Sequence, residues 1–586
     1  MIPMRDGKKL YTSIYMPKDS TERHPILMTR TPYSSAPYGL DAWPNFASRY
    51  HRLYFRENYI MIFQDVRGKF MSEGQYMDIR PFNPTKKGTE IDEASDSYDA
   101  VEWIVKNIPN NNGNVGAFGI SYPGFYATMV ALSGHPAVKA VSPQAPVTDW
   151  FMGDDFHHNG AFMLMDAFSF YPSFGRPRPQ PTTQSASSRF TPTGDNYRYY
   201  LKTGALKNFA KLMGDSILFW KDLYAHPNLD DWWKSRNPMN FVQHIPVTAN
   251  TLVVGGLFDA EDVFGAWNLY KAIEVKGKNN NKIVMGPWFH GQWGGGSDGA
   301  SLGNVQFGSK TSEWYQNNIE FPFFNYYLKG KGNGGNLPEA TIFFSGENKW
   351  KQLDQWPPKN TQTQNLFLQS DGSLAWSKPG GSNSFSEYTS DPAKPVPYTE
   401  DVHTRRTREY MTDDQRFASR RTDVLTFETD ILKSDLTLGG PLYAELFASI
   451  STTDADFVVK LIDVFPDTFR YKTSATPLPY PMEGYQMLVR GEIMRGKYRN
   501  SFEKPEPFTP GKVEKVKFYL PDVAHTFKKG HKIMVQVQSS WFPVADRNPQ
   551  KFINIYEAND SDFQKAEIMI YHSTQYPSSL IVPVIK

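Results

Sequence analysis

Short apolar runs alternate with stretches of helical spacing in the first part of the chain. Runs of strand length lie at residues 10–15, 25–29, 59–63, 115–118, 251–256 and 282–286. Residues 96–105 have helical spacing, and residues 314–328 are expected to form a final helix. Strands that alternate with helices indicate a mainly parallel sheet with helices on its faces.

This alternation is interrupted between residues 146 and 245, where the sequence is rich in aromatic residues, Met and His. Residues 197–220 and 230–233 look helical, whereas residues 176–194 have the composition of a loop. We therefore expect a largely helical insertion over the sheet, at the place where a substrate cap would lie.

A different pattern follows a glycine-rich linker at residues 330–336. Short alternating runs lie at residues 342–344, 366–368, 443–450, 457–464, 516–520, 533–537 and 568–571. Such spacing is typical of an antiparallel β-sandwich, and we expect a jelly roll. The predicted division is a first α/β part at 1–145, a helical cap at 146–245, a second α/β part at 246–336 and a β-sandwich at 337–586.

Composition limits the kinds of partner. The chain has 586 residues, a formal net charge of +2 and scattered Lys and Arg, so neither nucleic acid nor a membrane surface is expected as a partner. The chain has no Cys, which excludes disulfides, thiol catalysis and cysteine-ligated metals. No apolar run reaches the ~18 residues that a bilayer span needs. The first residues show no secretory signal, and composition leaves the native compartment open.

Ser121 lies in the stretch with the clearest chemical pattern. The apolar run 115–118 enters residues 119–124 (GISYPG), and residues 125–131 can form a helix. A serine on a sharp strand-to-helix turn is the nucleophile elbow of α/β-hydrolases, and the helix N-terminus suits a developing oxyanion. The usual pattern is G-x-S-x-G, and here the second glycine comes one position later. The motif alone does not separate a nucleophile from an ordinary glycine-rich junction.

A serine nucleophile on this fold needs an acid and then a histidine later in the chain. Asp259 follows the strand at residues 251–256, and His290 follows the strand at residues 282–286. These positions, like that of Ser121, lie beyond the carboxyl ends of sheet strands, where such sheets present functional groups. We therefore predict a triad of Ser121, Asp259 and His290.

His157 and His158 are the main rivals for the base. They precede the candidate acid and lie in the expected cap, which suits pocket lining or core packing better than a triad. An Asp directly after a strand, such as Asp259, is also common as a turn or helix-cap residue.

Carboxylates gather around the predicted triad. Glu261 and Asp262 follow Asp259 closely, and Asp154 and Asp155 lie in the segment FMGDDFHHNG. Three acids in four residues can form a solvated turn, but the position after an active-site strand allows Glu261 and Asp262 to face the pocket. Converging carboxylates would bind a cation such as a substrate ammonium group. A metal is not expected, because neither a calcium-loop nor an HExxH pattern is present.

The nucleophile also needs two donors for the oxyanion. The backbone N–H of Tyr122, the residue after the serine, would supply the first. Tyr33 follows the strand at residues 25–29, and its hydroxyl can reach the serine as the second donor. Core packing explains the position of Tyr33 equally well.

These residues together resemble the CocE/NonD hydrolases, the family that also holds the X-Pro dipeptidyl-peptidases. The resemblance extends over nearly the whole chain, and the late glycine of residues 119–124 matches the family's GxSYxG form. Further matching segments are residues 6–7 (DG), 30–33 (RTPY), 65–68 (DVRG), 286–290 (GPWFH), 539–543 (SSWFP) and 546–549 (DRNP). The resemblance implies an α/β-hydrolase domain with a helical cap and a C-terminal jelly roll, and no cofactor.

Within that family the chain looks most like the α-amino acid ester hydrolases. Their distinguishing feature is a cluster of carboxylates that holds the α-ammonium group of the substrate. By resemblance, two members of the cluster are Glu261 and Asp262. The third is Asp155 rather than Asp154.

The resemblance also assigns the oxyanion hole to Tyr33 and Tyr122, and implies a homo-oligomer, a tetramer, in the periplasm or outside the cell. The expected function is a serine hydrolase and acyltransferase for esters and amides of α-amino acids, α-amino β-lactams included. Small-molecule amines would act as acceptors in place of water. The alternatives are an X-prolyl dipeptidyl-peptidase or an aryl esterase of the cocaine-esterase type. A non-catalytic carbohydrate-binding protein is the alternative from outside the enzymes.

Overall fold

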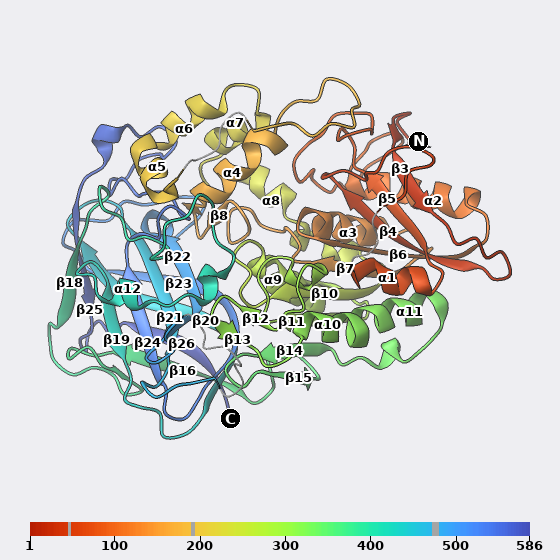
Figure 1. The fold of residues 1–586 in the computed structure, drawn as a ribbon. Helices are drawn as coiled ribbons and strands as arrows, with labels where there is room; N and C mark the ends of the chain where they lie inside the picture. The colour runs from red at the N-terminus through yellow and green to blue at the C-terminus, as the bar shows by residue number, and fades with distance from the viewer. Residues whose placement is uncertain (45–48, 189–193, 472–479) are drawn as a thin grey trace.

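A nine-stranded sheet forms the centre of the N-terminal half of the molecule (Figure 1). The structure is a computed structural model that describes residues 1–44, 49–188, 194–471 and 480–586. In spatial order the strands are β15 (Lys349–Leu353), β14 (Ala340–Phe344), β11 (Asn281–Gly286), β10 (Asn250–Gly256), β7 (Val138–Gln144), β6 (Asn111–Ile120), β4 (His24–Thr31), β5 (Ile60–Asp65) and β3 (Thr12–Tyr15). All neighbours between β14 and β5 pair in parallel, and the antiparallel strands β15 and β3 form the edges.

Helices cover both faces of this sheet because its strands are apolar on both sides. In β4, Ile26 and Met28 belong to a different core cluster from Leu27, which packs with Tyr54 and Phe323. One face is covered by α2 (Glu93–Asn107), α3 (Tyr122–Leu132) and α9 (Val263–Lys276), and the other by α1 (Arg49–Arg56), α10 (Thr311–Tyr315) and α11 (Phe321–Lys329). The mainly parallel sheet predicted from the sequence is therefore present, and its strands from β11 to β5 in this order contribute to both cores. The run at residues 342–344, expected in the β-sandwich, instead lies in β14 of this sheet.

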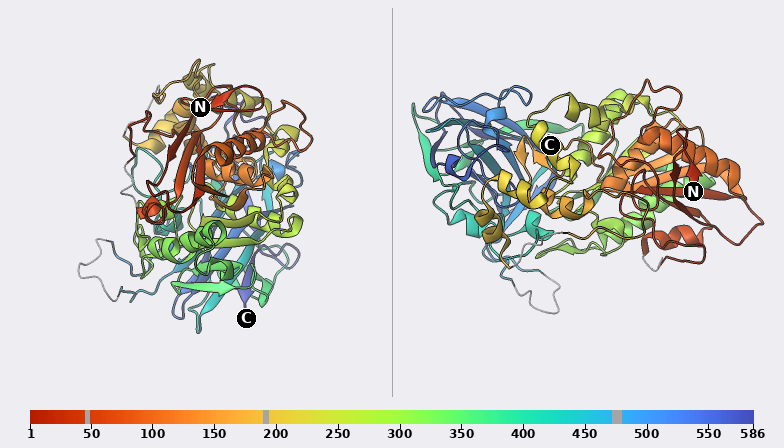
Figure 2. Two further views of the ribbon diagram at one scale, coloured as in Figure 1. Left: turned by 90° about the vertical axis from the view of Figure 1, so that its right-hand side faces the viewer. Right: turned by 90° about the horizontal axis from the view of Figure 1, so that it is seen from above.

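The insertion between β7 and β10 is largely helical. Its helices are α4 (Leu164–Phe174), α5 (Asn196–Thr203), α6 (Leu206–Met213), α7 (Leu218–Ala225) and α8 (Asp231–Arg236). The helical stretch expected at residues 197–220 is broken, because Gly204 at φ 87° ends α5 and Gly214 at φ 76° ends α6. Part of the loop expected at residues 176–194 lies outside the described residues. In Figure 2 these helices lie between the two ends of the elongated molecule.

The helix expected at residues 314–328 begins earlier and is not uniform. It consists of α10, a π-helical turn η4 (Gln316–Glu320) and α11, and ends at Gly330 in the left-handed conformation. Among the described residues, no helix is long and apolar enough to cross a membrane. Other short helices are η1 (Pro238–Asn240), η2 (Val242–His244), η3 (Gln292–Gly294), η5 (Gly334–Asn336), η6 (Glu409–Thr412), α12 (Arg416–Ser419), η7 (Gly496–Tyr498) and η8 (Asp560–Asp562).

The C-terminal part consists of two antiparallel sheets. The seven-stranded sheet contains β16 (Thr361–Leu368), β17 (Leu374–Ala375), β18 (Phe385–Ser390), β20 (Leu436–Ile450), β23 (Glu514–Phe527), β25 (Ala566–Tyr571) and β26 (Ser579–Ile585). The four-stranded sheet contains β19 (Leu425–Glu428), β24 (Lys532–Gln538), β21 (Asp456–Val464) and β22 (Gln486–Arg495). Three short pairs lie elsewhere: β1 (Ile2–Pro3) with β2 (Lys9–Leu10), β8 (His157–His158) with β9 (Ala161–Phe162), and β12 (Ser301–Leu302) with β13 (Val305–Gln306).

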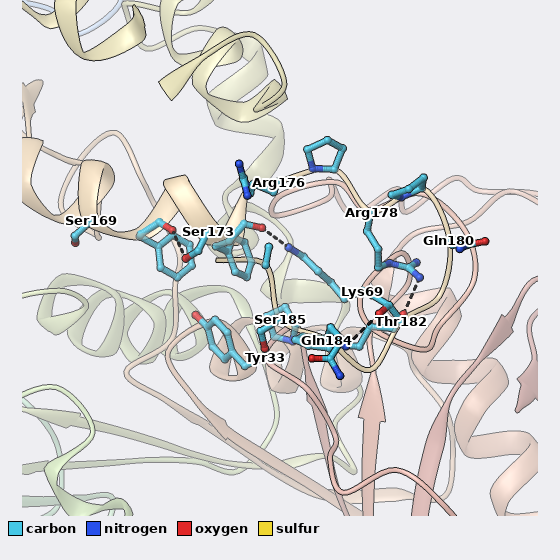
Figure 3. A pocket seen from close by; sticks show the side chains of 17 residues that line it. Tyr33, Lys69, Ser169, Ser173, Arg176, Arg178, Gln180, Thr182, Gln184 and Ser185 are labelled. Atoms are coloured by element: carbon cyan, nitrogen blue, oxygen red, sulfur yellow. Dashed lines mark hydrogen bonds between the residues drawn. The ribbon is translucent and has the colours of Figure 1, made fainter. Parts of the chain in front are cut away.

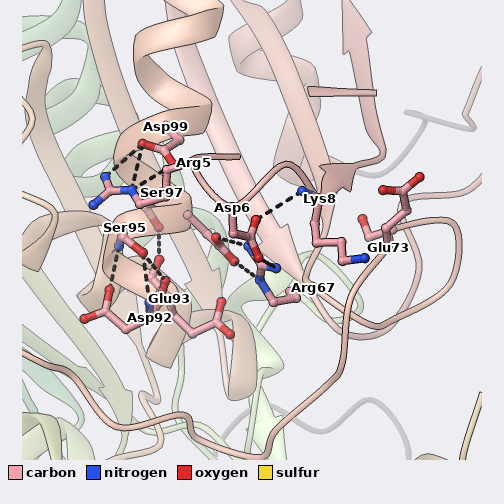
Figure 4. A network of polar contacts seen from close by, with 12 residues as sticks. Arg5, Asp6, Lys8, Arg67, Glu73, Asp92, Glu93, Ser95, Ser97 and Asp99 are labelled. Atoms are coloured by element: carbon pink, nitrogen blue, oxygen red, sulfur yellow. Dashed lines mark hydrogen bonds and ion pairs between the residues drawn. The ribbon is translucent and has the colours of Figure 1, made fainter. Parts of the chain in front are cut away.

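Arg67, from the DVRG segment, ties the start of the chain to α2 (Figure 4). Its guanidinium lies 2.6 Å from Asp6 Oδ2 and 2.6 Å from Asp96 Oδ1. Nearby, Arg5 pairs with Asp99 at 2.8 Å. Arg67 is buried and bound on both sides, so the segment that follows β5 is fixed to the α2 face of the sheet.

Candidate active site

Ser121 lies between the end of β6 and the start of α3, at φ 68° and ψ −129°. Few residues with a side chain adopt this backbone conformation, and strain of this kind is typical of functional turns. The Ser121 N–H donates to the Gln144 carbonyl at 2.9 Å, and the Ser121 carbonyl accepts from the Gly124 N–H at 2.7 Å. The turn thus presents the hydroxyl at the carboxyl edge of the sheet, where Ser121 lines a cavity of about 240 Å³.

The two glycines around the serine allow this turn to pack closely. A Cβ atom at Gly119 would lie 2.4 Å from the carbonyl oxygen of Pro123. At Gly124 it would lie 2.5 Å from the carbonyl oxygen of Gln144. Neither position has room for a side chain, and the late second glycine serves the contact between α3 and β7.

His290 and Asp259 form an acid–base pair. The imidazole Nδ1 lies 2.9 Å from Asp259 Oδ2 and 3.1 Å from Oδ1. Asp259 is fully buried and also accepts from the backbone N–H groups of Glu261 at 2.8 Å and Asp262 at 3.0 Å. Among the described residues no hydrogen bond joins His290 to Ser121, and the imidazole Nε2 instead lies 3.3 Å from Glu261 Oε2.

The surrounding carboxylates hold a proton on His290. Burial by itself would lower the pKa of His290, but the charges of Asp259, Glu261 and Asp155 outweigh burial and raise this pKa to about 10. Burial would likewise raise the pKa of Asp259, yet the His290 charge and the hydrogen bonds to Asp259 lower it. At neutral pH the free site therefore contains an imidazolium paired with a carboxylate.

Tyr33 brings its hydroxyl to the serine from the loop after β4. The side chain is 43% exposed overall, yet burial of the hydroxyl end is the main reason that the Tyr33 pKa is raised well above its usual value. The negative charges of Asp155, Glu261 and Asp262 add to this effect, and a hydrogen bond with Ser121 opposes it. A phenol that stays protonated next to the serine hydroxyl is placed as an oxyanion donor requires.

Tyr122 is the first residue of α3, so its backbone N–H lies at the positive end of that helix. Its side chain is fixed away from the serine, since the phenol oxygen donates to Asp78 Oδ1 at 3.1 Å and accepts from the Ile79 N–H at 2.7 Å. The Tyr122 N–H therefore has the position of the first oxyanion donor predicted from the sequence.

The structure separates the roles of Asp154 and Asp155. Asp154 accepts from the backbone N–H and hydroxyl of Thr148 at 2.8 and 2.6 Å and from the Gly265 N–H at 2.7 Å. Asp155 lines the Ser121 cavity, and its Oδ2 accepts from the Trp150 indole at 2.8 Å. Burial, together with nearby carboxylates, raises the pKa of Asp155 to about 8. Asp154 thus joins two loops, whereas Asp155 lies at the cavity wall, where it can contact a bound molecule.

Glu261 and Asp262 also differ in their surroundings. Glu261 lines the cavity with Ser121. Asp262 is fully buried, with one carboxylate oxygen 3.8 Å from His290 Nδ1. Neither oxygen of Asp262 has a hydrogen-bond partner among the described residues, and burial raises its pKa well above the usual range. Within that same part of the chain, no group of three or more His, Asp or Glu is arranged to hold a metal ion.

Two charged residues of the cavity wall were not predicted from the sequence: Arg406 and Asp166. Arg406 lies between β18 and η6, and its Nε is 2.6 Å from Asp166 Oδ1 in α4. Its Nη2 pairs with Glu261 Oε1. Arg406 lies in an arginine-rich stretch, residues 405–408 (RRTR). Which of these arginines reaches the cavity depends on the C-terminal part folding over the cap, so the local sequence does not single out Arg406.

A second cavity of about 570 Å³ adjoins the first (Figure 3). Both cavities are lined by Tyr33, Ser169 and Phe170. The larger one has mainly apolar walls and contains Lys69, whose ammonium donates to the Phe174 carbonyl at 2.8 Å. Burial lowers the pKa of Lys69 to about 8. A substrate at Ser121 therefore has an apolar space beyond Tyr33.

The rival histidines pack in the core, one of the two roles expected for them. His157 lies 2.9 Å from the Trp150 carbonyl and 2.9 Å from the Tyr556 hydroxyl. His158 pairs with Glu492 at 2.9 Å. Both rings are buried, and neither lines the cavity that contains Ser121.

A parallel sheet with a serine on a strained strand-to-helix turn and a nearby Asp–His pair defines a serine hydrolase of the α/β-hydrolase class. Residues 6–292 match the model of the X-Pro dipeptidyl-peptidase (S15) family, and residues 326–581 match the C-terminal non-catalytic domain of X-Pro dipeptidyl-peptidases. The chain belongs to this family of hydrolases. The predicted family and fold class, an α/β-hydrolase with a β-rich C-terminal domain, are confirmed.

Several relatives match over the full length of the chain. An aminopeptidase from a marine sediment Thaumarchaeota archaeon is 38% identical, with a TM-score of 0.92 and coverage of 100% of this chain and 96% of that one. An α-amino acid ester hydrolase is 36% identical, with a TM-score of 0.91 and coverage of 100% and 95%. The cocaine esterase of Rhodococcus sp. (strain MB1 Bresler) is 27% identical over 100% of this chain and 98% of its own length.

Proposed function

We propose that this hydrolase cleaves esters and amides of α-amino acids through an acyl-enzyme on Ser121. The observation that carries the proposal is the pair of carboxylates, Asp155 and Glu261, in the wall of the cavity that contains Ser121 and Tyr33. An uncharged aryl ester offers nothing for two half-buried acids to bind, whereas an α-ammonium group next to the acyl carbonyl does. The aminopeptidase and the α-amino acid ester hydrolase among the similar structures favour the same substrate class.

In the proposed reaction His290 Nε2 takes the proton from the Ser121 hydroxyl, and the oxygen attacks the acyl carbonyl. Asp259 orients the imidazole through Nδ1 and stabilises the imidazolium. The Tyr122 N–H and the Tyr33 hydroxyl donate to the oxyanion. His290 returns the proton to the leaving alcohol or amine, and water or an amine acceptor then attacks the acyl-enzyme.

Substrate orientation comes from the carboxylates in this scheme. Asp155 and Glu261 would bind the α-ammonium directly, and Asp262 lies buried next to them. Because the α-ammonium is held, the neighbouring carbonyl carbon lies against Ser121. Such a contact lowers the entropic cost of bringing the reacting atoms together. The adjoining apolar cavity beyond Tyr33 leaves space for a bulky part of the substrate.

The proposal is tested by comparing phenylglycine methyl ester with methyl phenylacetate, which differs only by lacking the amino group. We expect kcat/KM to favour the amino ester by about 100-fold or more, since a buried charge-assisted contact contributes ~3 kcal/mol. Asp155→Asn should reduce the amino-ester value by about 10-fold or more, without a matching loss on the des-amino ester. Equal values for the two esters in the wild-type enzyme would exclude the proposed ammonium site.

A further inference from the structure

Charged groups of alternating sign form a chain that ends at the catalytic imidazole. Asp166 in α4 binds Arg406 Nε at 2.6 Å, and Arg406 Nη2 binds Glu261 Oε1. The other oxygen of Glu261, Oε2, lies 3.3 Å from His290 Nε2. His290 Nδ1 in turn lies 2.9 Å from Asp259. Glu261 therefore connects an arginine of the C-terminal part to the base of the triad.

Nε2 of His290 is the atom that must accept the proton of Ser121, and here it faces a carboxylate instead. Ser121 meanwhile lies with Tyr33 in the wall of the same cavity. Because an imidazole accepts a proton only when Nε2 is free of one, a His290 that donates from Nε2 to Glu261 cannot act as the base. The free enzyme thus has its acid–base pair assembled while the base is held in an unproductive state.

Charged groups reach His290 from several elements. The loop after β10 contributes Asp259, Glu261 and Asp262, the loop after β7 contributes Asp155, and the C-terminal part contributes Arg406 through Glu261 and Arg490 next to Asp259. Acidic side chains outnumber basic ones in this set, and the charges of Asp259, Glu261 and Asp155 raise the pKa of His290. A cation placed among these acids would oppose their effect on the imidazole.

We propose that Glu261 is a positioning residue that keeps His290 protonated in the free enzyme and releases it when the cationic group of a substrate binds. This inference rests on the proposed function, because it takes the α-ammonium as that cation. The ammonium would replace the imidazolium at Glu261 Oε2, while Arg406 keeps hold of Oε1. The proton then leaves His290 Nε2 for the solvent, and Nε2 becomes free to accept from Ser121.

Specificity would then arise in the chemical step as well as in binding. A substrate without the ammonium could occupy the cavity, but His290 would stay protonated at neutral pH. An α-amino substrate would both fill the acidic site and supply the charge that makes the base available. Differential stabilisation of this kind raises kcat rather than only lowering KM.

Methyl phenylacetate is the probe for the free enzyme, because it has no titrating group of its own and the pH profile of kcat/KM reports the free base. The substitution Glu261→Gln keeps an oxygen for Arg406 but removes the charge opposite Nε2. We expect the acid limb of the profile to move to lower pH and kcat/KM at neutral pH to rise by about 10-fold for each pKa unit lost. On phenylglycine methyl ester the same variant should be slower than the wild type.

Two matched variants separate this role from a structural one. Asp155→Asn removes a carboxylate of the same cavity that does not touch His290, and it should shift the acid limb less than Glu261→Gln does. Glu261→Asp restores the charge, and it should move the limb back towards the wild-type position. If Glu261→Gln lowers the activity on methyl phenylacetate and leaves the acid limb in place, the proposal is wrong.

Proton release on binding gives a second measurement that does not depend on turnover. Phenylglycinol carries the ammonium but no acyl carbonyl, so its binding to the wild-type enzyme can be followed by calorimetry in two buffers of different ionisation enthalpy. We expect a proton to leave the complex at neutral pH, and none to leave with Glu261→Gln. If phenylglycinol binds to the wild-type enzyme without proton release, the role inferred for Glu261 is wrong, but the proposed function stands. If kcat/KM is equal for phenylglycine methyl ester and methyl phenylacetate, the proposed function itself is wrong.

Discussion

Two Ser–His–Asp arrangements occur at the carboxyl ends of strands of the same sheet. Ser121 follows β6 near His290 and Asp259. Ser345 follows β14, and its hydroxyl lies 2.8 Å from Nδ1 of His525, whose Nε2 lies 3.1 Å from Asp463. The second set is the more completely hydrogen-bonded of the two.

The second arrangement has none of the features that expose a nucleophile. Ser345, His525 and Asp463 are each at most 2% exposed. The backbone of Ser345 pairs with Ala524 at 3.1 Å and Thr526 at 2.8 Å. At Ser121 the backbone is strained, the hydroxyl lines a cavity, and a phenol and a helix N-terminus are aimed at the same space. Access and oxyanion donors, rather than the three residue types, distinguish a catalytic serine from a structural one.

Replacing each serine by alanine in turn should give the largest difference between the two sites. Ser121→Ala is expected to lower kcat by about 10⁶-fold, because the nucleophile is lost. Ser345→Ala should leave kcat unchanged and lower the melting temperature, since a buried hydrogen bond to His525 is removed. Hydrolysis of an amino acid p-nitrophenyl ester gives the rates, and retained activity in Ser121→Ala would refute the assignment of the nucleophile.

Asp259 and Asp463 should show the same contrast as the two serines, with a catalytic effect at Asp259 and a structural effect at Asp463. Asp259→Asn is expected to lower kcat by about 10⁴-fold with little effect on stability, because the amide favours the wrong imidazole tautomer. Asp463 is bound by both His525 at 3.1 Å and His531 at 2.8 Å, so Asp463→Asn should mainly destabilise the fold. The expected loss is about 1–3 kcal/mol in urea unfolding. If Asp463→Asn lowers kcat more than Asp259→Asn does, the assignment of a catalytic role to Asp259 and a structural role to Asp463 is wrong.

Tyr33→Phe tests the oxyanion donor that Ser345 lacks. Removing the hydroxyl should lower kcat by about 100-fold, with a smaller change in KM, because the donor acts on the transition state. Tyr200→Phe, at a buried tyrosine of the cap, serves as the control and should retain activity. If Tyr33→Phe changes KM alone, the hydroxyl contributes to binding and not to the oxyanion.

The sequence was sufficient to predict the elements that depend on local pattern. Strand ends, the glycine spacing and chain order placed Ser121, Asp259 and His290 at one edge of the sheet, since parallel strands share a carboxyl edge. Breaks in the cap helices at Gly204 and Gly214 were missed because apolar spacing continues across them.

Contacts between distant segments could not be predicted in the same way. Arg406 reaches Glu261 from the C-terminal part, and the burial of Asp262 depends on several loops packing together. Whether an acid faces solvent, a cavity or the interior is set by tertiary packing, which residue type and spacing do not encode. The family resemblance chose Asp155 over Asp154, and the contacts of Asp154 with Thr148 give that choice its physical reason.

The most direct test of the central claim is a crystal structure of the Ser121→Ala variant with bound phenylglycine methyl ester. We expect the α-ammonium to lie within hydrogen-bonding distance of Asp155 and Glu261, with the carbonyl oxygen directed to Tyr33 and to the Tyr122 N–H. An ester bound with its amino group in the apolar cavity, away from both carboxylates, would contradict the claim.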